Sequence, residues 1–382
     1  SMTDSIKNAQ EIGQSIWYDN MRRGLIDSGE LKSLIDAGIT GLTSNPTIFQ
    51  KAIAETSDYD QAISKLGRKT PAEIFEKLGI EDIQQAADML RPIYEKSGGG
   101  DGYASFEVNP HLAHDTELTV IEGKKLFAEL DRPNVMIKVP ATPEGMPAIT
   151  ELVGAGVNIN VTLIFSLSAY HQVMDAYIAG LEELDRRGGD VSKIGSVASF
   201  FVSRVDTNVD NLLSEEVALG RSSCGELLGK AAIGNAKLAY KAFKLQFAQA
   251  RFMELQGKGA RVQRPLWAST SVKNPNYDEL LYVKNLLGPD TVNTLPEVTV
   301  GILMEREIEV KPTIETGLDV LTRLPESLAE VGISMEEVTG QLLKDGVQAF
   351  KDSYDELLAS IQMKTASLTE AATNAPLVSG GG

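Results

Sequence analysis

The stretch from residue 135 to residue 164, VMIKVPATPEGMPAITELVGAGVNINVTLI, places a helical segment between two short runs rich in β-branched residues. The same alternation recurs along most of the chain, and alternating strands and helices favour a parallel sheet. Eight such units in roughly 300 residues predict an α/β fold, a (β/α)8 TIM barrel. An open, doubly wound sheet is the competing fold, but no glycine-rich dinucleotide turn follows the first strand. The predicted strands span 15–19, 38–45, 104–109, 135–140, 157–164, 195–202, 264–270 and 291–296.

These strands carry apolar side chains on one face and polar side chains on the other. Side chains alternate along a strand, so Val135, Ile137 and Val139 share one face and Lys138 lies on the opposite face. The outer face of such a barrel packs against helices, which turns the polar face inward. Burying so many polar groups costs too much desolvation for packing alone, and catalytic residues of these barrels lie at the carboxyl ends of the strands. The candidates found in this way are Asp19, Thr43, Asn45, Glu107, Lys138, Asn160, Thr162, Ser199, Arg204 and Ser269.

Lys138 has the most specific chemistry of these candidates. We expect a barrel interior to lower its pKa, and a neutral amine attacks a carbonyl carbon to form a Schiff base. Taken alone, VMIKVP also fits an exposed strand lysine or one half of a structural ion pair. Inward-facing Glu107 and Asp19 on other strands favour the catalytic interpretation, because two carboxyls in different environments divide the proton transfers that a Schiff-base reaction needs.

The overall charge narrows the range of partners. Lys and Arg number 36 against 53 Asp and Glu, a formal net charge of −17. Such a surface repels polyanions, so we expect no nucleic-acid or membrane partner, although a few local cations suffice to hold a small phosphorylated ligand. Cys224 is the only cysteine, which fits a reducing compartment. With no apolar run of about 18 residues and no signal pattern at the start, the sequence predicts a cytoplasmic protein.

No metal or cofactor site is predicted. His111 and His114 have the spacing of a metal pair, but no third ligand is obvious in the sequence. The region around Gly229 and Lys230 fails as a phosphate-binding P-loop, because Cys224 occupies the position of the first glycine and Ala231 replaces Ser or Thr. We interpret Cys224 as an inert thiol.

The last part of the chain differs from the barrel pattern. Residues 301–382 hold fourteen acids and six bases. Ser334 and Glu337 form a capping box, and apolar residues then recur at three- or four-residue spacing as far as Ile361, which predicts one long amphipathic helix. We therefore divide the chain into a catalytic barrel at 2–330 and a helical extension at 331–382 that packs on the barrel, with a frayed tail after about residue 365.

Three local patterns complete the prediction. Thr70 and Glu73 form a capping box with Pro71 at the first helical position, and Ser168 is expected to cap the helix that follows the fifth strand. Residues 226–256 carry a further helical pattern. The glycine-rich segment 98–102 is expected to be a flexible connector.

Several motifs resemble those of the transaldolase family, most closely its longer bacterial type. The resemblance covers roughly residues 15–300 and follows the order and spacing of all the predicted strands. The motifs are GITGLTSNPTIF (38–49), FEVNP (106–110), VMIKVPAT (135–142), GVNINVTLIFS (156–166), SFFVSRVD (199–206) and LWASTSVKNP (266–275).

The resemblance implies a metal-free class I aldolase mechanism without a cofactor. It implies that Lys138 forms the Schiff base, that Glu107 acts as acid and base through a water, and that Asp19 handles the sugar hydroxyl proton during carbon–carbon cleavage. Arg204 and Ser269 would hold the substrate phosphate, since a guanidinium offers a planar donor fork. Residues implied to contact the water, the substrate or the intermediate are Thr43, Asn45, Asn160, Thr162, Ser199 and Phe201.

The sequence departs from shorter relatives in two places. They carry an arginine soon after the serine of the seventh strand, whereas here Ser271 follows and Lys273 is the nearest cation. The residue after Asp19 is Asn20, so the assignment of Asp19 rests mainly on its position. Lys273 is therefore the candidate for the second phosphate cation.

The implied reaction belongs to the non-oxidative pentose phosphate pathway. A dihydroxyacetone unit passes from sedoheptulose 7-phosphate to glyceraldehyde 3-phosphate, which gives erythrose 4-phosphate and fructose 6-phosphate. Two alternatives stay open: an aldolase that cleaves fructose 6-phosphate, and a phosphosugar-binding barrel without catalysis. The sequence leaves the choice between a monomer and a homodimer open.

Overall fold

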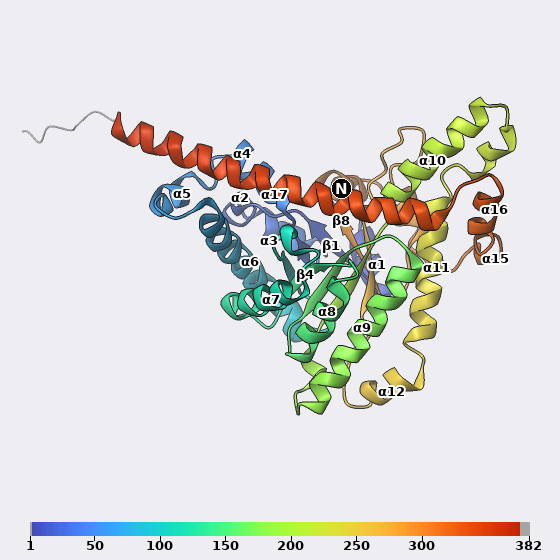
Figure 1. Cartoon of the computed structure of the whole chain (residues 1–382), viewed down its shortest axis with the longest axis horizontal. Coiled ribbons are helices and arrows are strands. Elements are labelled where there is room, and N and C mark those ends of the chain that lie inside the picture. The colour runs from blue at the N-terminus through green and yellow to red at the C-terminus, as the bar shows by residue number, and fades with distance from the viewer. Residues whose placement is uncertain (1, 375–382) are drawn as a thin grey trace, which may run out of the picture.

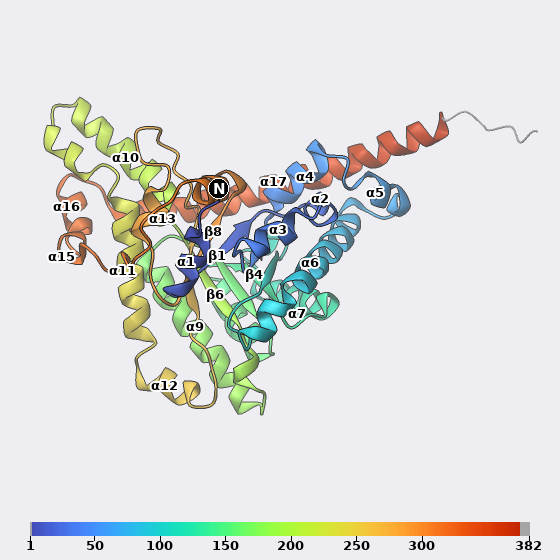
Figure 2. The ribbon, with the colours of Figure 1, turned by 180° about the vertical axis from the view of Figure 1, so that it is seen from behind.

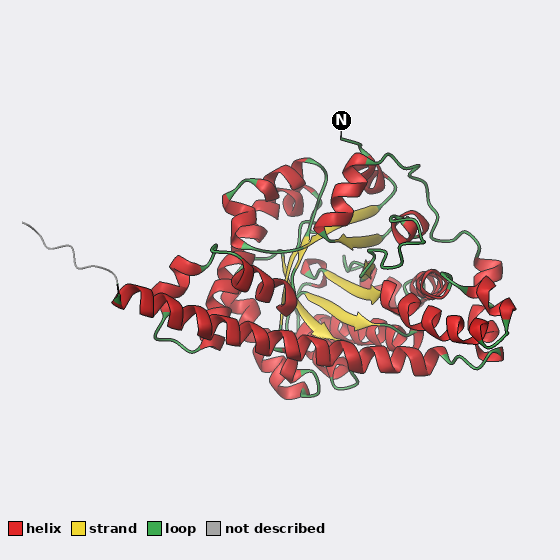
Figure 3. Ribbon diagram, turned by 90° about the horizontal axis from the view of Figure 1, so that it is seen from above, coloured by secondary structure: helices red, strands yellow, loops and turns green. Residues whose placement is uncertain are grey.

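The computed structural model describes residues 2–374, and within them eight strands form a closed parallel barrel in sequence order. The barrel predicted from the sequence is thus confirmed, and the open-sheet alternative is wrong. Figure 3 shows the strands enclosed by helices. The strands are β1 (Gln14–Asp19), β2 (Leu42–Thr43), β3 (Ala104–Glu107), β4 (Val135–Pro140), β5 (Ile159–Ile164), β6 (Ser196–Phe201), β7 (Arg264–Ala268) and β8 (Thr291–Leu295).

The helices surround the barrel and cross one of its ends. The α-helices are α1 (Ser5–Glu11), α2 (Arg23–Asp27), α3 (Glu30–Asp36), α4 (Pro46–Glu55), α5 (Asp60–Leu66), α6 (Pro71–Lys96), α7 (Thr116–Leu130), α8 (Gly145–Gly154), α9 (Leu167–Arg186), α10 (Ser203–Ala218), α11 (Ala231–Gln246), α12 (Ala250–Gln256), α13 (Leu281–Asn285), α14 (Glu297–Glu305), α15 (Leu318–Leu321), α16 (Leu324–Glu330) and α17 (Met335–Thr373). Short 3₁₀ turns are η1 (Pro110–Leu112), η2 (Val191–Lys193) and η3 (Ser222–Leu227).

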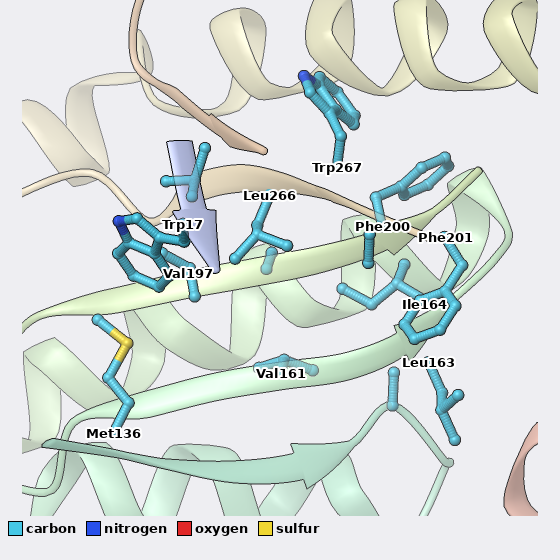
Figure 4. Close-up of a cluster of buried hydrophobic side chains, with 14 of the residues drawn as sticks. Trp17, Met136, Val161, Leu163, Ile164, Val197, Phe200, Phe201, Leu266 and Trp267 are labelled. Atoms are coloured by element: carbon cyan, nitrogen blue, oxygen red, sulfur yellow. The ribbon is translucent and has the colours of Figure 1, made fainter. Parts of the chain in front are cut away.

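Alternation along the strands separates the core from the site. Phe200 of β6 and Trp267 of β7 point outward into the helix layer, with ring centroids 6.1 Å apart (Figure 4). Their neighbours Ser199 and Leu266 are paired in register and both line a cavity at the end of the barrel. The apolar outer face and the partly polar interior therefore arise from the same two-residue period.

Two of the local predictions about helix starts have different outcomes. The Thr70 hydroxyl accepts a hydrogen bond from the Glu73 amide at 3.2 Å, so the capping box of α6 is confirmed. The cap of α9 is Ser166 and not Ser168, because Ser166 has an extended backbone and its hydroxyl accepts the Ala169 amide at 3.0 Å. Ser168 already lies inside the first turn.

The helical pattern of residues 226–256 is divided into α11 and α12. The helix is interrupted at residues 247–249, and Phe247 in this break packs edge-on against Phe252 of α12 with ring centroids 4.8 Å apart. Burial of this aromatic pair favours two short helices over one continuous helix.

The glycine-rich segment at residues 98–102 is more than a flexible connector. Asp101 is buried, and its carboxylate accepts hydrogen bonds from the Ser15 hydroxyl at 2.6 Å and from the Trp17 indole at 2.9 Å. Gly102 has a positive φ of 85°, and a Cβ there would lie 2.5 Å from the Tyr94 backbone nitrogen. The glycine is needed so that the segment can bring Asp101 against β1.

Helix α17 is the long amphipathic helix that the sequence predicts, and Ser334 caps it through the Glu337 amide at 3.2 Å. It contacts α4, α5, α6 and α10, and Figures 1 and 2 both show it lying across the same edge of the molecule. Its side chains bind residues of α4 and α5: the Thr47 hydroxyl donates to Ser353 at 2.7 Å, and Lys364 binds Asp60.

The predicted fraying after about residue 365 is wrong as far as Thr373, where α17 ends. Alanines favour the helix there. Threonine hydroxyls also donate to carbonyls one turn earlier, from Thr369 to Thr365 at 2.8 Å and from Thr373 to Thr369 at 2.9 Å. The rest of the predicted tail, residues 375–382, lies outside the described residues.

Across residues 2–374, no helix combines the length and the apolar character needed to cross a membrane.

Candidate active site

A cavity of about 170 Å³ opens at the carboxyl end of the barrel strands. Ten of the twelve site residues predicted from the sequence line it. Their elements are strands β1, β2, β4, β5 and β6 together with the segments that follow β2, β6 and β7. These residues are Asp19, Thr43, Asn45, Lys138, Thr162, Ser199, Phe201, Arg204, Ser269 and Lys273.

Lys138 projects from the middle of β4 into this cavity and is only 6% exposed. Its ammonium donates to the Ser44 carbonyl oxygen at 3.1 Å. Among residues 2–374, no carboxylate lies within 4.0 Å of its Nζ, so the structure offers no ion pair that would account for this lysine. A buried amine that faces a cavity is positioned to act as a nucleophile.

Glu107 stands beside Lys138, because β3 and β4 pair in register at these two residues. Burial raises the pKa of Glu107 to about 7; the nearby Lys138 charge opposes the rise and Asp19 adds to it. Its Oε2 atom is buried without a hydrogen-bond partner in the described part of the chain. Glu107 also lines a neighbouring cavity of about 180 Å³, which shares Asn45 with the first. A carboxyl that titrates near neutrality suits both proton donation and proton acceptance.

Asp19 ends β1 and is paired in register with Thr43 of β2. The Thr43 hydroxyl donates to Asp19 Oδ1 at 3.0 Å. Burial raises the pKa of Asp19, while the charges of Lys138 and Arg204 and the Thr43 hydrogen bond act in the opposite direction. The structure thus places a second carboxyl, in a different environment, near the lysine.

Asn160 lies one strand further on, paired in register with Lys138. It is fully buried below the cavity, where its amide donates to Ser105 at 3.1 Å and its Oδ1 accepts the Ser199 hydroxyl at 2.7 Å. Asn160 therefore orients Ser199, which lines the cavity. Two residues along β5, the Thr162 hydroxyl is buried with no hydrogen-bond partner in residues 2–374.

Asn45 has a structural task as well as a place in the cavity wall. It caps α4, and its Oδ1 accepts the Ile48 amide at 3.0 Å. The capping bond fixes the carboxamide at the cavity edge, which a motif match alone does not reveal.

The other side of the cavity carries the cations. Arg204 lies in the first turn of α10, with its guanidinium 5.3 Å from the centre of the Phe201 ring. In the described chain it has no hydrogen bond or ion pair to a side chain. Burial lowers its pKa, against the effect of Asp19. Loss of hydration, followed by the charge of Arg204, also lowers the pKa of Lys273, which donates to Ser271 at 2.6 Å.

Ser269 follows β7 in a left-handed conformation with a φ of 55°. Such a conformation is strained for a residue with a side chain and is found mainly where the surroundings enforce it. Here the Ser203 amide donates to the Ser269 carbonyl at 2.9 Å, and the two hydroxyls lie 2.8 Å apart. These contacts hold Ser269 at the cavity wall.

The sequence interpretation missed several wall residues. Phe350 reaches the cavity from α17, and Ser271, Thr294 and Pro296 also line it. Phe350 was visible as part of the apolar stripe of the last helix, but nothing in that stripe tells which of its residues lies over the barrel mouth.

The two histidines considered as a metal pair have separate partners. His111 Nε2 lies 2.7 Å from Asp355 Oδ1, and His114 Nδ1 lies 3.1 Å from Glu144 Oε2. In the described residues no group of three or more His, Cys, Asp or Glu side chains is arranged to hold a metal ion. Cys224 is buried.

Comparisons with known proteins show which proteins this chain resembles over most of its length. Residues 16–361 match the family described as Transaldolase/Fructose-6-phosphate aldolase. The chain is 43% identical over 378 residues to a transaldolase of Trichodesmium erythraeum, covering 96% of this chain and 99% of that protein. It is 45% identical over 365 residues to transaldolase 2 of Streptomyces coelicolor, covering 94% and 97%. It is 44% identical over 371 residues to a transaldolase of Thermobifida fusca, covering 96% and 100%.

Proposed function

The chain belongs to the Transaldolase/Fructose-6-phosphate aldolase family and is a transferase of the transaldolase type, and we propose that Lys138 carries its reaction. The proposed reaction moves a dihydroxyacetone unit from sedoheptulose 7-phosphate to glyceraldehyde 3-phosphate, which gives erythrose 4-phosphate and fructose 6-phosphate. The observation that carries this proposal is the register of β3 and β4, which sets Glu107 beside a lysine that has no ion pair in residues 2–374.

The first step is attack of the Lys138 amine on the C2 carbonyl of the donor ketose. The resulting carbinolamine loses its hydroxyl as water, which requires a proton donor. Glu107 fits this role, because its pKa of about 7 leaves it partly protonated at neutral pH. The unpartnered oxygens Glu107 Oε2 and Thr162 Oγ1 are the groups that we assign to binding this water.

The second step breaks the C3–C4 bond of the Schiff base. We assign Asp19 as the base that takes the proton of the C4 hydroxyl, so that C4 leaves as an aldehyde and the bond electrons pass to the enamine on Lys138. Thr43 holds the Asp19 carboxyl in place at 3.0 Å. The acceptor aldehyde then reverses these steps, and water releases the product from Lys138.

The phosphate is assigned to the cation side of the cavity. Arg204, Ser269 and Lys273 line this side, and Arg204 has no carboxylate partner in the described chain. A guanidinium and an ammonium together with a hydroxyl provide donors suited to a phosphate dianion. Asn45, Ser199 and Phe201 complete the wall between the lysine and the cations.

The remaining features of the proposal concern the whole chain. We propose residues 2–330 as the catalytic barrel and 331–382 as its extension, supported by Phe350 of α17 in the cavity wall. The substrates are then small sugar phosphates, with no cofactor. We propose a cytoplasmic location, consistent with a single buried cysteine.

One experiment tests the proposed reaction against its alternatives. Purified protein is given fructose 6-phosphate with and without erythrose 4-phosphate, and release of glyceraldehyde 3-phosphate is followed. We expect sustained turnover only with the acceptor. Sustained release of dihydroxyacetone without acceptor would indicate an aldolase, and binding without any turnover would indicate a non-catalytic barrel.

A further inference from the structure

The two cations assigned to the substrate phosphate lie on different elements. Arg204 is in the first turn of α10, whereas Lys273 lies in the segment between β7 and α13. Both also line an open groove of about 580 Å³ next to the cavity, together with Thr207 and Asn208 of α10. Binding a phosphate between the two cations requires that the two elements keep a fixed spacing.

The segment after β7 has few anchors of its own on this side. Lys273 is exposed, and its side-chain hydrogen bond is to Ser271, two residues earlier. Asp278 in the same segment binds Lys284 at 2.6 Å and Arg306 at 2.7 Å, and neither of these partners belongs to α10. The contacts between Ser203 and Ser269 join the elements only at their base.

Two aspartates on one face of α10 connect the helix to Tyr277 in this segment and to Tyr282 in α13, directly after it. Asp206 is buried, and its carboxylate accepts the Tyr282 hydroxyl at 2.6 Å and the Ala232 amide at 2.8 Å. One helical turn later, Asp210 accepts the Tyr277 hydroxyl at 2.8 Å and the Gly229 amide at 3.0 Å. Hydrogen bonds to ionised carboxylates are short and strong, so each pair is an effective tie.

Gly229 permits the outer of these ties. Its φ is +73°, and a Cβ at this position would lie 3.0 Å from Tyr277 Cζ. A side chain here would therefore press against the tyrosine ring that Asp210 holds, which explains the need for glycine.

We propose that the Asp206–Tyr282 and Asp210–Tyr277 hydrogen bonds form a clamp that sets the spacing of Arg204 and Lys273 and thereby the affinity for the substrate phosphate. This inference rests on the proposed function, in which these two cations bind the phosphate. The four clamp residues are positioning residues, because they act through Arg204 and Lys273.

The test removes the two tyrosine hydroxyls with the variants Tyr277→Phe and Tyr282→Phe, singly and together. We expect the KM for fructose 6-phosphate to rise about tenfold in the double variant and less in each single variant, with kcat within about twofold of wild type. Borohydride trapping of dihydroxyacetone on Lys138 is measured in parallel. It is expected to be unchanged, because this ligand has no phosphate.

A matched control is available elsewhere in the barrel. The Tyr59 hydroxyl donates to buried Asp82 at 2.6 Å, and burial raises the pKa of Asp82 and of Asp206 alike to about 6. Neither Tyr59 nor Asp82 lines the cavity or the groove. Tyr59→Phe should therefore lower the thermal stability by a similar amount and leave the KM for fructose 6-phosphate unchanged.

Two results would overturn the clamp while leaving the proposed function in place. One is an unchanged KM for fructose 6-phosphate in the single and double variants. The other is an equal rise of KM in Tyr59→Phe, which would indicate a general loss of structure. Failure of the wild type to form any adduct with dihydroxyacetone would contradict the proposed function, and the clamp with it. The single variants keep the test decisive if the double variant does not fold.

Discussion

The two sides of the active-site cavity are built from different kinds of structure. Asp19, Glu107 and Lys138 project from β1, β3 and β4, where parallel ladders fix every backbone position. Arg204 and Lys273 lie in a helical first turn and in a loop segment, tied together by side-chain hydrogen bonds. We infer that the covalent chemistry takes place on the side built from strands and that substrate recognition takes place on the side held together by side-chain hydrogen bonds.

This division suits the proposed reaction. The reacting carbonyl must meet the same three groups in every turnover, and small errors in their placement are costly. The phosphate, in contrast, lies one carbon further from the carbonyl in a seven-carbon donor than in a six-carbon donor. The phosphate side therefore does not set the geometry at the reacting carbonyl, and changes on this side are expected to act on binding.

The largest effect is expected on the strand side, at Lys138. Without its amine no Schiff base forms, so Lys138→Ala should lower kcat by about 10⁴-fold or more. Steady-state kinetics with fructose 6-phosphate and erythrose 4-phosphate measure the loss. The control is Lys237→Met, at a second buried lysine, which donates to the Thr313 and Thr316 carbonyls away from the cavity. A comparable loss of kcat in Lys237→Met would show that Lys138 has no special role in the reaction.

A smaller loss is expected for Glu107→Gln, which keeps the shape of the side chain and removes its acid–base function. We predict a decrease in kcat of about 10²–10⁴-fold. A kcat of Glu107→Gln within a few fold of the wild-type value would show that another group transfers the proton.

The same variant should be more stable than the wild type at high pH. The folded-state pKa of Glu107 is raised to about 7 from 4.5, so the fold disfavours the charged form. The destabilisation of the wild type therefore grows from pH 4.5 to pH 7 and stays constant above that, on the order of 3 kcal/mol. Thermal unfolding of both proteins at pH 5 and pH 8 measures this effect. The stability of Glu107→Gln relative to the wild type should be greater at pH 8 than at pH 5. A constant difference between variant and wild type would contradict the raised pKa.

On the cation side we expect an effect on binding and not on the chemistry. Arg204→Ala removes charge-assisted hydrogen bonds to phosphate and should raise the KM for fructose 6-phosphate about 10- to 100-fold. Trapping of dihydroxyacetone on Lys138 should be preserved. The matched control is Arg261→Ala, because Arg261 binds the Gly98 carbonyl at 3.1 Å and does not line the cavity. If both variants raised KM equally, the phosphate assignment would be wrong.

The smallest effect is expected at the helix that crosses the barrel mouth. Phe350→Leu keeps most of the buried volume of a side chain that is 6% exposed and shortens the part that faces the cavity. We expect the KM for fructose 6-phosphate to change by roughly threefold, with little loss of stability. Met363→Leu, on an exposed position of the same helix, should leave KM unchanged. Equal KM values in all three proteins would show that α17 only packs on the barrel.

The inward orientation of the site residues on the strands could be predicted from the sequence, because it depends only on neighbouring residues along each strand. A two-residue alternation in VMIKVP and ASFEVN is enough to turn Lys138 and Glu107 inward, and closure of the barrel brings them together. Six of the ten predicted residues that line the cavity lie on strands for this reason, and Glu107 and Asn160 lie beside and beneath the cavity. The other four cavity residues lie in the segments that follow the strands.

The features that escaped prediction depend on contacts between distant parts of the chain. Phe350 enters the cavity only because α17 crosses the barrel mouth. Asp101 is buried because Ser15 and Trp17 bind it, and no pattern within residues 98–102 indicates that partner. The choice between Ser166 and Ser168 as the α9 cap depends on where the strand before it ends. Long-range hydrogen bonds and the placement of a helix over the barrel have no periodic signature in the sequence.

The central claim is that Lys138 forms a covalent intermediate with the donor sugar. Its most direct test is borohydride reduction in the presence of fructose 6-phosphate, followed by peptide mass spectrometry. We predict a reduced three-carbon adduct on the peptide that carries Lys138, and none in Lys138→Ala. An unmodified protein, or an adduct on a different lysine, would contradict the account.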